Sequence, residues 1–472
     1  MFRILSAFFL LTVLSFSQVS AQTDSIRRTE GTEVIVTGFP AEEGVTPVPV
    51  EDIKQQKIEE HTSITQPAKV ASFTPSANFY SQSGTEIGYT YLTIRGFEQR
   101  RLSILVNGVP QNDPEDHNVY WIDMPDLLGS TGRIQIQRGA GSAFYGPPAI
   151  GGSINVETEF PSAQALTLSA GYGSFDTRKV AIEGSTGVFA DNWLAHARLS
   201  TTQTDGYRNG AFVDLFSYYL ALKRVSESHI LQFNAFGGPI KDGLDYLGIY
   251  DWMGIDLKDR EQRKYNLSDS YSYERRPEEV ERFFQPHFEV MSTYFIDPVM
   301  TLKNTFFYVQ GDGEFDFDGT WTGSAARYFR LTKPYADLYG FTPISDTIAS
   351  LGNELMRAYV GNKQFGWLPR MEWKYASADI YLGAEARIHN SVHWGSLLQG
   401  DLAPRSVLND YHYYEYEAGK KIFSPYAALN YKLEEGLTLF GSLQLVAQEY
   451  HFENEKPFYV DTVMAQSNGL NP

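Results

Sequence analysis

From residue 161 onward, apolar and polar residues alternate with a period of two. In the run from Ile380 to Ile388, the even-numbered residues are apolar, whereas Glu385 and Arg387 lie between them. Successive side chains of a β-strand point to opposite faces of its sheet, so this pattern predicts strands with one apolar face and one polar face.

The connections between these strands differ in length in a regular way. We predict eleven strands, at residues 165–172, 178–185, 193–201, 214–223, 229–236, 284–294, 300–310, 367–375, 379–388, 422–432 and 437–446. The three long links, 237–283, 311–366 and 389–421, all follow odd-numbered strands, so all of them lie on one side of the sheet. Outer-membrane barrels have this asymmetry, whereas a β-sandwich has no reason to sort its loops. The sequence therefore predicts an antiparallel transmembrane β-barrel over residues 161–472.

Residues 50–160 have a mixed pattern, which predicts a separate α/β domain. Residues 52–62 have helical character, and short strands are predicted at 92–95, 103–106, 133–137 and 153–158. The pair Asn107-Gly108 suits the tight turn of a hairpin. Five glycines predict sharp backbone turns between the last two strands: Gly139, Gly141, Gly146, Gly151 and Gly152.

The N-terminal residues predict export. An apolar run from Ile4 to Phe16 follows Arg3, is too short to span a bilayer and precedes small residues that end at Ala21. We therefore predict a signal peptide over residues 1–21, cleaved after Ala21. Residues 22–49 are polar and predict a flexible arm, in which residues 33–37 form a short β-prone run that can pair with the sheet of a partner.

Composition excludes several classes of function. The net charge of −18 argues against DNA or RNA as a partner. The chain has no cysteine, which excludes disulfides, thiolate metal sites and cysteine catalysis. Gly141 and Gly146 have the spacing of a phosphate-binding loop, but Pro147 and Pro148 stand where that loop needs Lys and Ser or Thr. The sequence therefore predicts neither an enzyme nor a bound cofactor, and an outer-membrane hydrolase within a barrel is only a minor alternative.

Four segments of the N-terminal domain resemble, in order and spacing, the plug domain of TonB-dependent outer-membrane receptors. These segments are residues 92–97 (LTIRGF), 104–110 (ILVNGVP), 136–146 (IQRGAGSAFYG) and 150–156 (IGGSINV). Within the plug, residues 87–90, 112–115 and 120–126 look most like the ferric-citrate-type receptors of Bacteroidetes-like bacteria. Residues 50–160 are therefore identified as a plug domain.

The resemblance implies a fold, a place and a set of partners. It implies a barrel of the 22-stranded type, of which about eleven strands are present, in the outer membrane of a Gram-negative bacterium. A half-barrel would leave unpaired backbone in lipid, so we expect residues 1–472 to be the N-terminal half of a longer receptor. The β-prone run then corresponds to the TonB box, which the inner-membrane TonB-type energy protein would bind: Glu33, Val34, Ile35, Val36 and Thr37.

The resemblance also implies a function, the energised uptake of a scarce ligand such as an iron chelate carried by a siderophore or by citrate. Haem, cobalamin or another ligand is an alternative cargo. Other classes of function remain open: a surface adhesin or structural barrel, a receptor that signals through a periplasmic domain, or a non-functional truncated receptor.

Individual residues are predicted from the same resemblance. Arg95 and Arg138 match plug arginines that face carboxylates of the barrel wall, for which Glu183, Glu372 and Glu385 are candidates, because a buried arginine needs such a partner. The predicted structural residues of the plug are Arg95, Gly96, Asn107, Gly108, Arg138, Gly139, Gly141, Gly146, Gly151 and Gly152. The predicted ligand contacts are Gln82, Tyr89, Gln99, Arg100, Arg101, Asn112, His117 and Trp121.

Two further patterns bear on the ligand. The adjacent guanidinium groups of Arg100 and Arg101 suit a carboxylate-rich metal chelate, although such a pair is more often simply solvated. His389, His393 and His412 fall in a predicted long loop and are candidate ligands of a metal or haem. A Tyr- and His-rich loop that packs on itself is the alternative explanation of these histidines.

Overall fold

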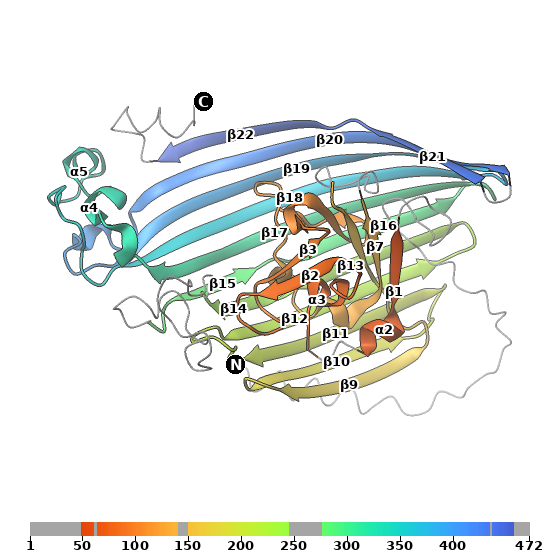
Figure 1. Ribbon diagram of the computed structural model, residues 1–472, viewed down its shortest axis with the longest axis horizontal. Helices are drawn as coiled ribbons and strands as arrows, with labels where there is room; N and C mark the ends of the chain where they lie inside the picture. Colours follow the sequence, from red (N-terminus) through yellow and green to blue (C-terminus); the bar gives the residue numbers. More distant parts are fainter. Residues whose placement is uncertain (1–48, 61–63, 140–149, 245–275, 435–436, 457–472) are drawn as a thin grey trace. The chain divides into compact units, whose positions relative to one another are not determined.

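The computed structural model describes residues 49–60, 64–139, 150–244, 276–434 and 437–456, most of them in β-strands. Residues 49–158 form an N-terminal domain, and the strands after it form one large antiparallel sheet, here called the wall (Figure 1). Hydrogen bonds join the loops of the N-terminal domain to one face of the wall.

The N-terminal domain is built on two small sheets. The larger has the order β1-β7-β8-β5-β6 and the smaller the order β2-β3-β4. Their elements are β1 Val50–Lys54, α2 Gln55–Glu59, α3 Pro67–Ala71, β2 Ala77–Ser81, β3 Thr90–Ile94, β4 Phe97–Glu98, β5 Leu102–Val106, β6 Val109–Pro110, β7 Thr131–Arg138 and β8 Gly152–Thr158. Fully buried aliphatic side chains such as Ile104, Ile134 and Ile154 fill the space between the sheets and α3.

The predicted hairpin is confirmed, and one predicted helix is wrong. Asn107 and Gly108 connect β5 and β6 with φ of 52° and 79°, values that suit a two-residue turn. Residues 52–54, predicted as helical, belong instead to β1, which pairs antiparallel with β7. The cause is a distant partner: Asp52 accepts from Arg133 at 2.8 Å and Ile53 pairs with Ile134. Of the described residues of the predicted helix, 52–60, only Gln55–Glu59 are helical.

In the part of the chain that the structure describes, the wall contains fourteen strands. They are β9 Gln164–Gly173, β10 Thr177–Thr186, β11 Trp193–Thr204, β12 Val213–Val225, β13 His229–Gly237, β14 Pro239–Gly243, β15 Val280–Phe284, β16 His287–Phe295, β17 Met300–Asp318, β18 Leu355–Lys374, β19 Ala378–Gln399, β20 His412–Glu434, β21 Leu437–Gln444 and β22 Ala447–Lys456. The pairs β13/β14, β15/β16 and β21/β22 each continue along one neighbouring strand. The fourteen strands therefore occupy eleven places, as predicted.

Four strands extend much further than predicted. β17, β18, β19 and β20 contain 19 to 23 residues. Two of the predicted long loops shrink accordingly, to residues 319–354 and 400–411. Apolar residues are less frequent in the parts of these strands that extend beyond the prediction. There Asp312, Glu314 and Glu417 lie on the face of the wall that points away from the N-terminal domain. In these parts apolar and polar residues no longer alternate regularly, although the backbone hydrogen bonds between the strands continue.

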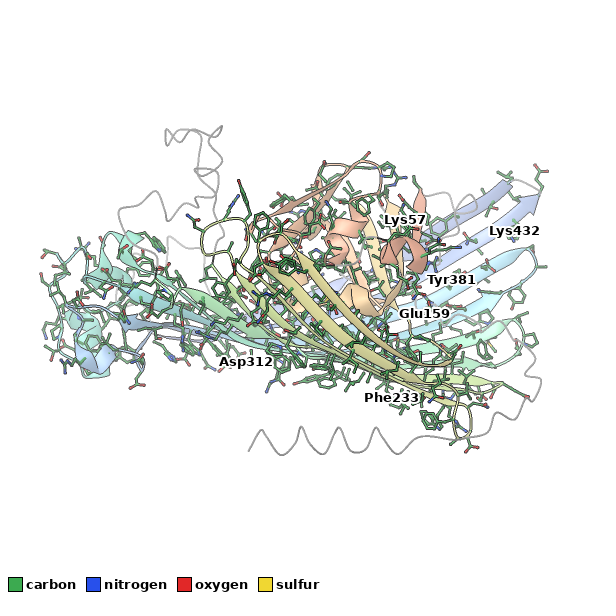
Figure 2. The ribbon with its side chains drawn as sticks, turned by 90° about the horizontal axis from the view of Figure 1, so that it is seen from below. Lys57, Glu159, Phe233, Asp312, Tyr381 and Lys432 are labelled. Atoms are coloured by element: carbon green, nitrogen blue, oxygen red, sulfur yellow. The ribbon has the colours of Figure 1, made fainter. Side chains whose placement is uncertain are left out.

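The two faces of the wall differ in chemistry. Phe233, Phe306 and Trp367 are exposed on the face that points away from the N-terminal domain, and Figure 2 shows Phe233 on that side. Tyr381, on the opposite face, is buried against Leu105 of the N-terminal domain. Among the described residues, no helix is both long enough and apolar enough to cross a lipid bilayer.

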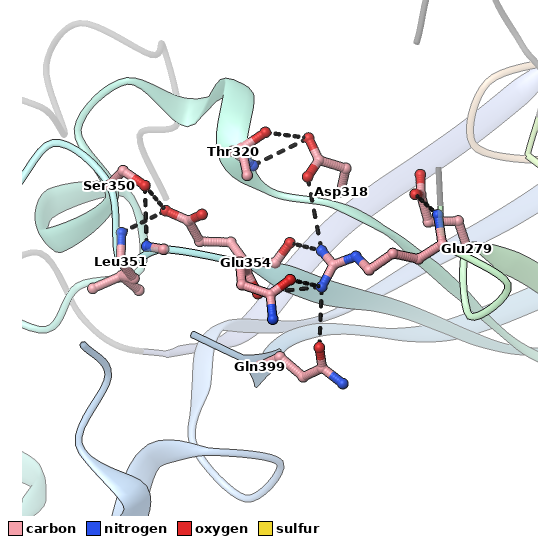
Figure 3. A network of polar contacts seen from close by, with 10 residues as sticks. Glu279, Asp318, Thr320, Ser350, Leu351, Glu354 and Gln399 are labelled. Atoms are coloured by element: carbon pink, nitrogen blue, oxygen red, sulfur yellow. Dashed lines mark hydrogen bonds and ion pairs between the residues drawn. The ribbon is translucent and has the colours of Figure 1, made fainter. Parts of the chain in front are cut away.

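The loops that connect the long strands fold around their own core. Phe329 and Leu331, which follow α4 (Ala325–Tyr328), pack with Leu397 and Tyr413 of the wall, and α5 (Lys333–Tyr339) lies in the same loop. Arg276 fixes the base of this unit (Figure 3). Its guanidinium donates to the side chains of Asn353 and Gln399 at 2.9 and 3.0 Å and pairs with Asp318 at 3.8 Å.

The packing of the N-terminal domain can be tested at Gly152. Gly152, the first residue of β8, has φ of 142°, and a Cβ added there would lie 2.2 Å from the carbonyl oxygen of Gln137. We expect Gly152→Ala to destabilise the domain by more than about 2 kcal/mol, because backbone must move as well as adopt a strained φ. Urea titration of the protease resistance of this domain measures the effect.

Gly96→Ala is the matched control. Gly96 also has positive φ, 80°, but no atom lies within 4 Å of its added Cβ. Only the conformational cost of about 1 kcal/mol is expected there. Equal losses in the two variants would show that the close approach at Gly152 does not matter.

Candidate functional site

The N-terminal domain meets the first strands of the wall through a buried ionic cluster. Asp126, held at φ of 51°, accepts hydrogen bonds from Lys179 of β10 and from Arg198 of β11, the latter at 2.9 Å. Arg198 also donates to Glu183 at 2.8 Å. Burial opposes ionisation of Asp126, but Lys179 and Arg198 outweigh it and hold the pKa of Asp126 below its ordinary value. The carboxylate therefore stays charged and joins the domain to two strands.

A second contact joins loop 111–121 of the N-terminal domain to β19. The carboxylate of Glu115 lies 3.1 Å from Nε2 of both His389 and His393, and Ser391 donates its hydroxyl proton to the same group. Burial opposes ionisation of Glu115, yet the hydrogen bonds from His389, His393 and Ser391 hold its pKa below the ordinary value. Alternate residues of β19 point to one face, so all three donors meet one carboxylate.

Lys420 of β20 holds the same loop from the next strand. Its ammonium group donates to the carbonyl oxygen of Pro114 at 2.7 Å and lies 3.1 Å from Nε2 of His117. Burial and the positive charge of Lys420 lower the pKa of His117, so the imidazole is neutral and accepts. Lys420 sits opposite His389 in the ladder of β19 and β20.

A buried network fixes the loop from inside the domain. The amide of Asn112 donates to the carbonyl oxygens of Leu102 and His117 and accepts from the backbone of Ile104. Gln99 accepts from the indole of Trp121 at 3.2 Å and donates to Val119 at 2.7 Å. These bonds are internal, so Gln99, Asn112 and Trp121 shape the loops and their buried side chains are not offered to a ligand.

An exposed polar and aromatic surface covers the outer side of these loops. Tyr80 and Tyr91 stack with ring centroids 4.8 Å apart, and Tyr80 is 56% exposed. Asp116 accepts from Arg100 at 3.3 Å and from the hydroxyl of Tyr120 at 2.8 Å. We call these five residues the outer surface of the domain.

The outer surface faces the side of the wall that carries the long loops. The hydroxyl of Tyr89, from the loop between β2 and β3, donates to Glu281 at 2.6 Å. Glu281 lies in β15, at the end of the strand next to the long connection after β14. A ligand that approached between the long loops would therefore meet the outer surface first.

Residues 43–153 match the family model described as TonB-dependent Receptor Plug Domain. The chain contains the plug domain of a TonB-dependent receptor. The resemblance seen in the sequence is thereby confirmed, and the plug includes the loops and the outer surface described above. TonB-dependent receptors are outer-membrane β-barrel proteins of Gram-negative bacteria and are not enzymes.

Curated relatives match part of the chain. The vitamin B12 transporter BtuB of Vibrio cholerae is 30% identical over 177 residues, which are 37% of this chain and 28% of that protein. BtuB of Vibrio vulnificus is 32% identical over 128 residues, 27% of this chain and 20% of that protein. The matches therefore span less than a third of these relatives.

Solved structures match over most of the chain. The unliganded ferric citrate transporter FecA superposes with a TM-score of 0.64 at 15% identity, covering 87% of this chain and 57% of that chain. The ferric yersiniabactin uptake receptor FyuA from Yersinia pestis superposes with a TM-score of 0.61 at 13% identity, covering 86% and 61%. At such identities the likeness shows the fold: the wall corresponds to part of a receptor barrel.

The predicted partners of the plug arginines are wrong. Arg95 is exposed, and Arg138 donates to the carbonyl oxygen of Pro75. The three wall carboxylates pair instead with basic residues of the wall itself: Glu183 with Arg198, Glu372 with Arg370 and Lys303, and Glu385 with Arg387. Glu372 and Glu385 each have an arginine two residues away on the same face of the strand, Arg370 and Arg387, and this arginine is their partner.

The predicted loop position of the three histidines is also wrong. His389 and His393 lie within β19, and His412 begins β20, where its ring stacks on Trp394 and its Nδ1 lies 2.7 Å from Glu415. Within the parts of the chain that the structure describes, no group of three or more His, Cys, Asp or Glu side chains is arranged to hold a metal ion. The histidines act here in hydrogen bonds.

A small cavity lies between the plug and the wall beneath loop 111–121. It has a volume of about 40 Å³, and Asp113, Asp123, His287 and Gln364 are among its lining residues. Burial, with the nearby charge of Glu281, raises the pKa of Asp123 well above its ordinary value, and burial also raises the pKa of Asp113. The space suits ordered water, which bridges polar groups at such interfaces.

Some of the remaining predicted site residues lie at or beside the outer surface, and others lie outside the described residues. Gln82 donates to the hydroxyl of Tyr91 at 3.2 Å and Arg101 is exposed beside the outer surface. Residues 1–21, the TonB box at residues 33–37, Gly141 and Gly146 lie outside the described residues. Sequence reasoning missed Glu115, Asp116, Asp126 and Lys420. The signal for Glu115 and Asp126 was that they lie in two segments of the family resemblance, residues 112–115 and 120–126.

Proposed function

We propose that the protein is a TonB-dependent receptor that takes up a scarce ligand, an iron chelate, across the outer membrane. The observation that carries the proposal is a plug domain attached to a barrel wall, with its outer surface on the side of the long loops. The ligand would bind between those loops and the outer surface. The chain spans 57% of the length of FecA, so transport is a proposal for the full-length receptor.

The proposed partners and processing follow from the sequence. Residues 1–21 would direct export and be cleaved, and residues 33–37 would pair by strand addition with the inner-membrane TonB-type protein. Outer-membrane lipid would contact the apolar face that carries Phe233. Ligand contact is proposed for Gln82, Tyr89, Arg100, Arg101 and His117, together with Tyr80, Tyr91, Asp116 and Tyr120.

Deletion of the TonB box tests energised uptake directly. We expect the loss of Val34–Val36 from the full-length receptor to abolish growth on the iron chelate that the receptor serves, because no pulling force would reach the plug. Growth of the source strain on a panel of defined iron chelates is the measurement. A deletion of three residues elsewhere in the 22–32 arm is the control, and unchanged growth after box deletion would favour an adhesin or structural barrel.

Cobalamin is a second candidate cargo. It is favoured by the similarity to the vitamin B12 transporters of two Vibrio species. A strain without the receptor would then grow normally on every iron chelate and fail only when growth depends on external cobalamin. The two outcomes separate the candidates.

A further inference from the structure

Residues 113–118 form a closed loop that is held together by its own hydrogen bonds. The backbone N–H of Asp113 donates to the carbonyl oxygen of Asn118 at 2.8 Å, and that of His117 donates to the carbonyl oxygen of Asp113 at 2.9 Å. The carboxylate of Asp113 accepts from the backbone of Glu115 at 2.7 Å. Asp116 accepts from the backbone of Asn118 at 2.7 Å. Such bonds tie neighbouring residues to one conformation.

The two acidic residues in the middle of this loop face opposite ways. Glu115 turns to the wall, where His389, Ser391 and His393 hold it. Asp116 turns to the outer surface, where it contacts Arg100 and Tyr120. A rigid six-residue loop thus has one carboxylate on the wall and the next on the proposed ligand side.

We propose that loop 113–118 couples the Arg100 contact on the outer surface to the attachment of the plug on β19 and β20. A ligand group that takes Arg100 away from Asp116 loosens the hold of Glu115 on the wall. This inference rests on the proposed function, because it gives the outer surface the role of sensing the ligand.

The charges of the loop provide the physical cause. Glu115 and Asp116 place two carboxylates next to each other in the chain, and Arg100 is the cation that pairs with Asp116. The side chains of Arg100 and Asp116 are 50% and 36% exposed, so a carboxylate or other anion from solution can compete for the guanidinium. Once Arg100 is engaged elsewhere, repulsion within the loop is no longer offset.

Hydrogen exchange of the purified full-length receptor in detergent tests the coupling without any ligand. Arg100→Ala removes the cation as a competing anion would. We expect the amides of Glu115, Asp116 and Asn118 to exchange about threefold faster in this variant, because the loop opens more often. The matched control is Glu86→Ala, which removes another exposed ion pair of the plug, that of Glu86 with Lys69 at 3.0 Å.

A wall variant tests the reverse direction, because coupling between two sites is reciprocal. Ser391→Ala takes a donor from Glu115, and we expect it to speed exchange at Asn118, on the Asp116 side, while Ser391→Thr retains the hydroxyl and restores slow exchange. Exchange in Arg100→Ala equal to that in Glu86→Ala, or no effect of Ser391→Ala at Asn118, would overturn the coupling. Either result leaves the box-deletion test untouched, so the two proposals fail separately.

Discussion

Replacing Asp126 by Ala is expected to detach the plug from the first strands of the wall. The variant leaves Lys179 buried without its carboxylate, while Arg198 keeps only Glu183. Breaking a buried ion pair by removing one partner costs about 3–5 kcal/mol, since the remaining charge stays desolvated. The side chain of Asp126 is 4% exposed, so water cannot replace it without a local opening.

The urea midpoint at which protease begins to cut the plug of the full-length receptor measures this loss. Asp337→Ala is the matched control, because Asp337 pairs with Lys333 at 2.7 Å on an exposed helix and should leave the midpoint unchanged. Since the pKa of Asp126 is lowered in the folded protein, its contribution is full above about pH 5 and is lost only as the pH falls further. An equal midpoint for Asp126→Ala at pH 7 would show that the cluster does not anchor the plug.

A reversible disulfide between plug and wall is expected to stop uptake. The backbone N–H of Tyr207, between β11 and β12, donates to the carbonyl oxygen of Ser83 in the plug at 3.1 Å. A Cβ at Gly84 would lie 2.8 Å from Cβ of Tyr207, so a small local shift gives the spacing of a disulfide. The double variant Gly84→Cys with Tyr207→Cys is simple to interpret because the chain has no native cysteine.

If uptake requires the plug to move against the wall, the oxidised double variant should transport at a rate reduced roughly tenfold or more. A reducing agent should restore it. Each single cysteine variant is the control for the strain of a side chain at Gly84, where φ is 76°. Full uptake by the oxidised, cross-linked protein would mean that the ligand passes without movement of this part of the plug.

The sequence predicted the strands best where one face is apolar. The halves of β17 to β20 that lie next to the short turns alternate, so their positions were predicted correctly. The other halves mix apolar and polar side chains without a clear alternation. Backbone pairing alone extends them, and pairing has no periodicity that a sequence reveals. The same limit applies to β1, which is a strand because β7, some eighty residues away, is beside it.

The candidate site was predictable only in part. The resemblance to the plug pointed to Tyr89 and Arg100, which lie at or beside the outer surface, and their contact with a ligand stays a prediction. Which side chains of these loops are exposed could not be predicted, because Trp121 and Asn112 are satisfied by partners within the plug. Glu115 and His389 are 274 residues apart in the chain, so no local sequence pattern could predict their contact.

The unequal lengths of the wall strands have a consequence for how cargo arrives. A tilted strand needs about 9–11 residues to cross a bilayer, at roughly 3.3 Å per residue. β9 and β10 have 10 residues each, which is just enough to cross the bilayer, whereas β20 has 23 residues and extends beyond it. In the proposed receptor the rim beside β9 therefore ends near the lipid headgroups, while the rim at β20 extends well beyond them. A ligand that diffuses along the membrane surface would therefore enter more easily beside β9 than beside β20.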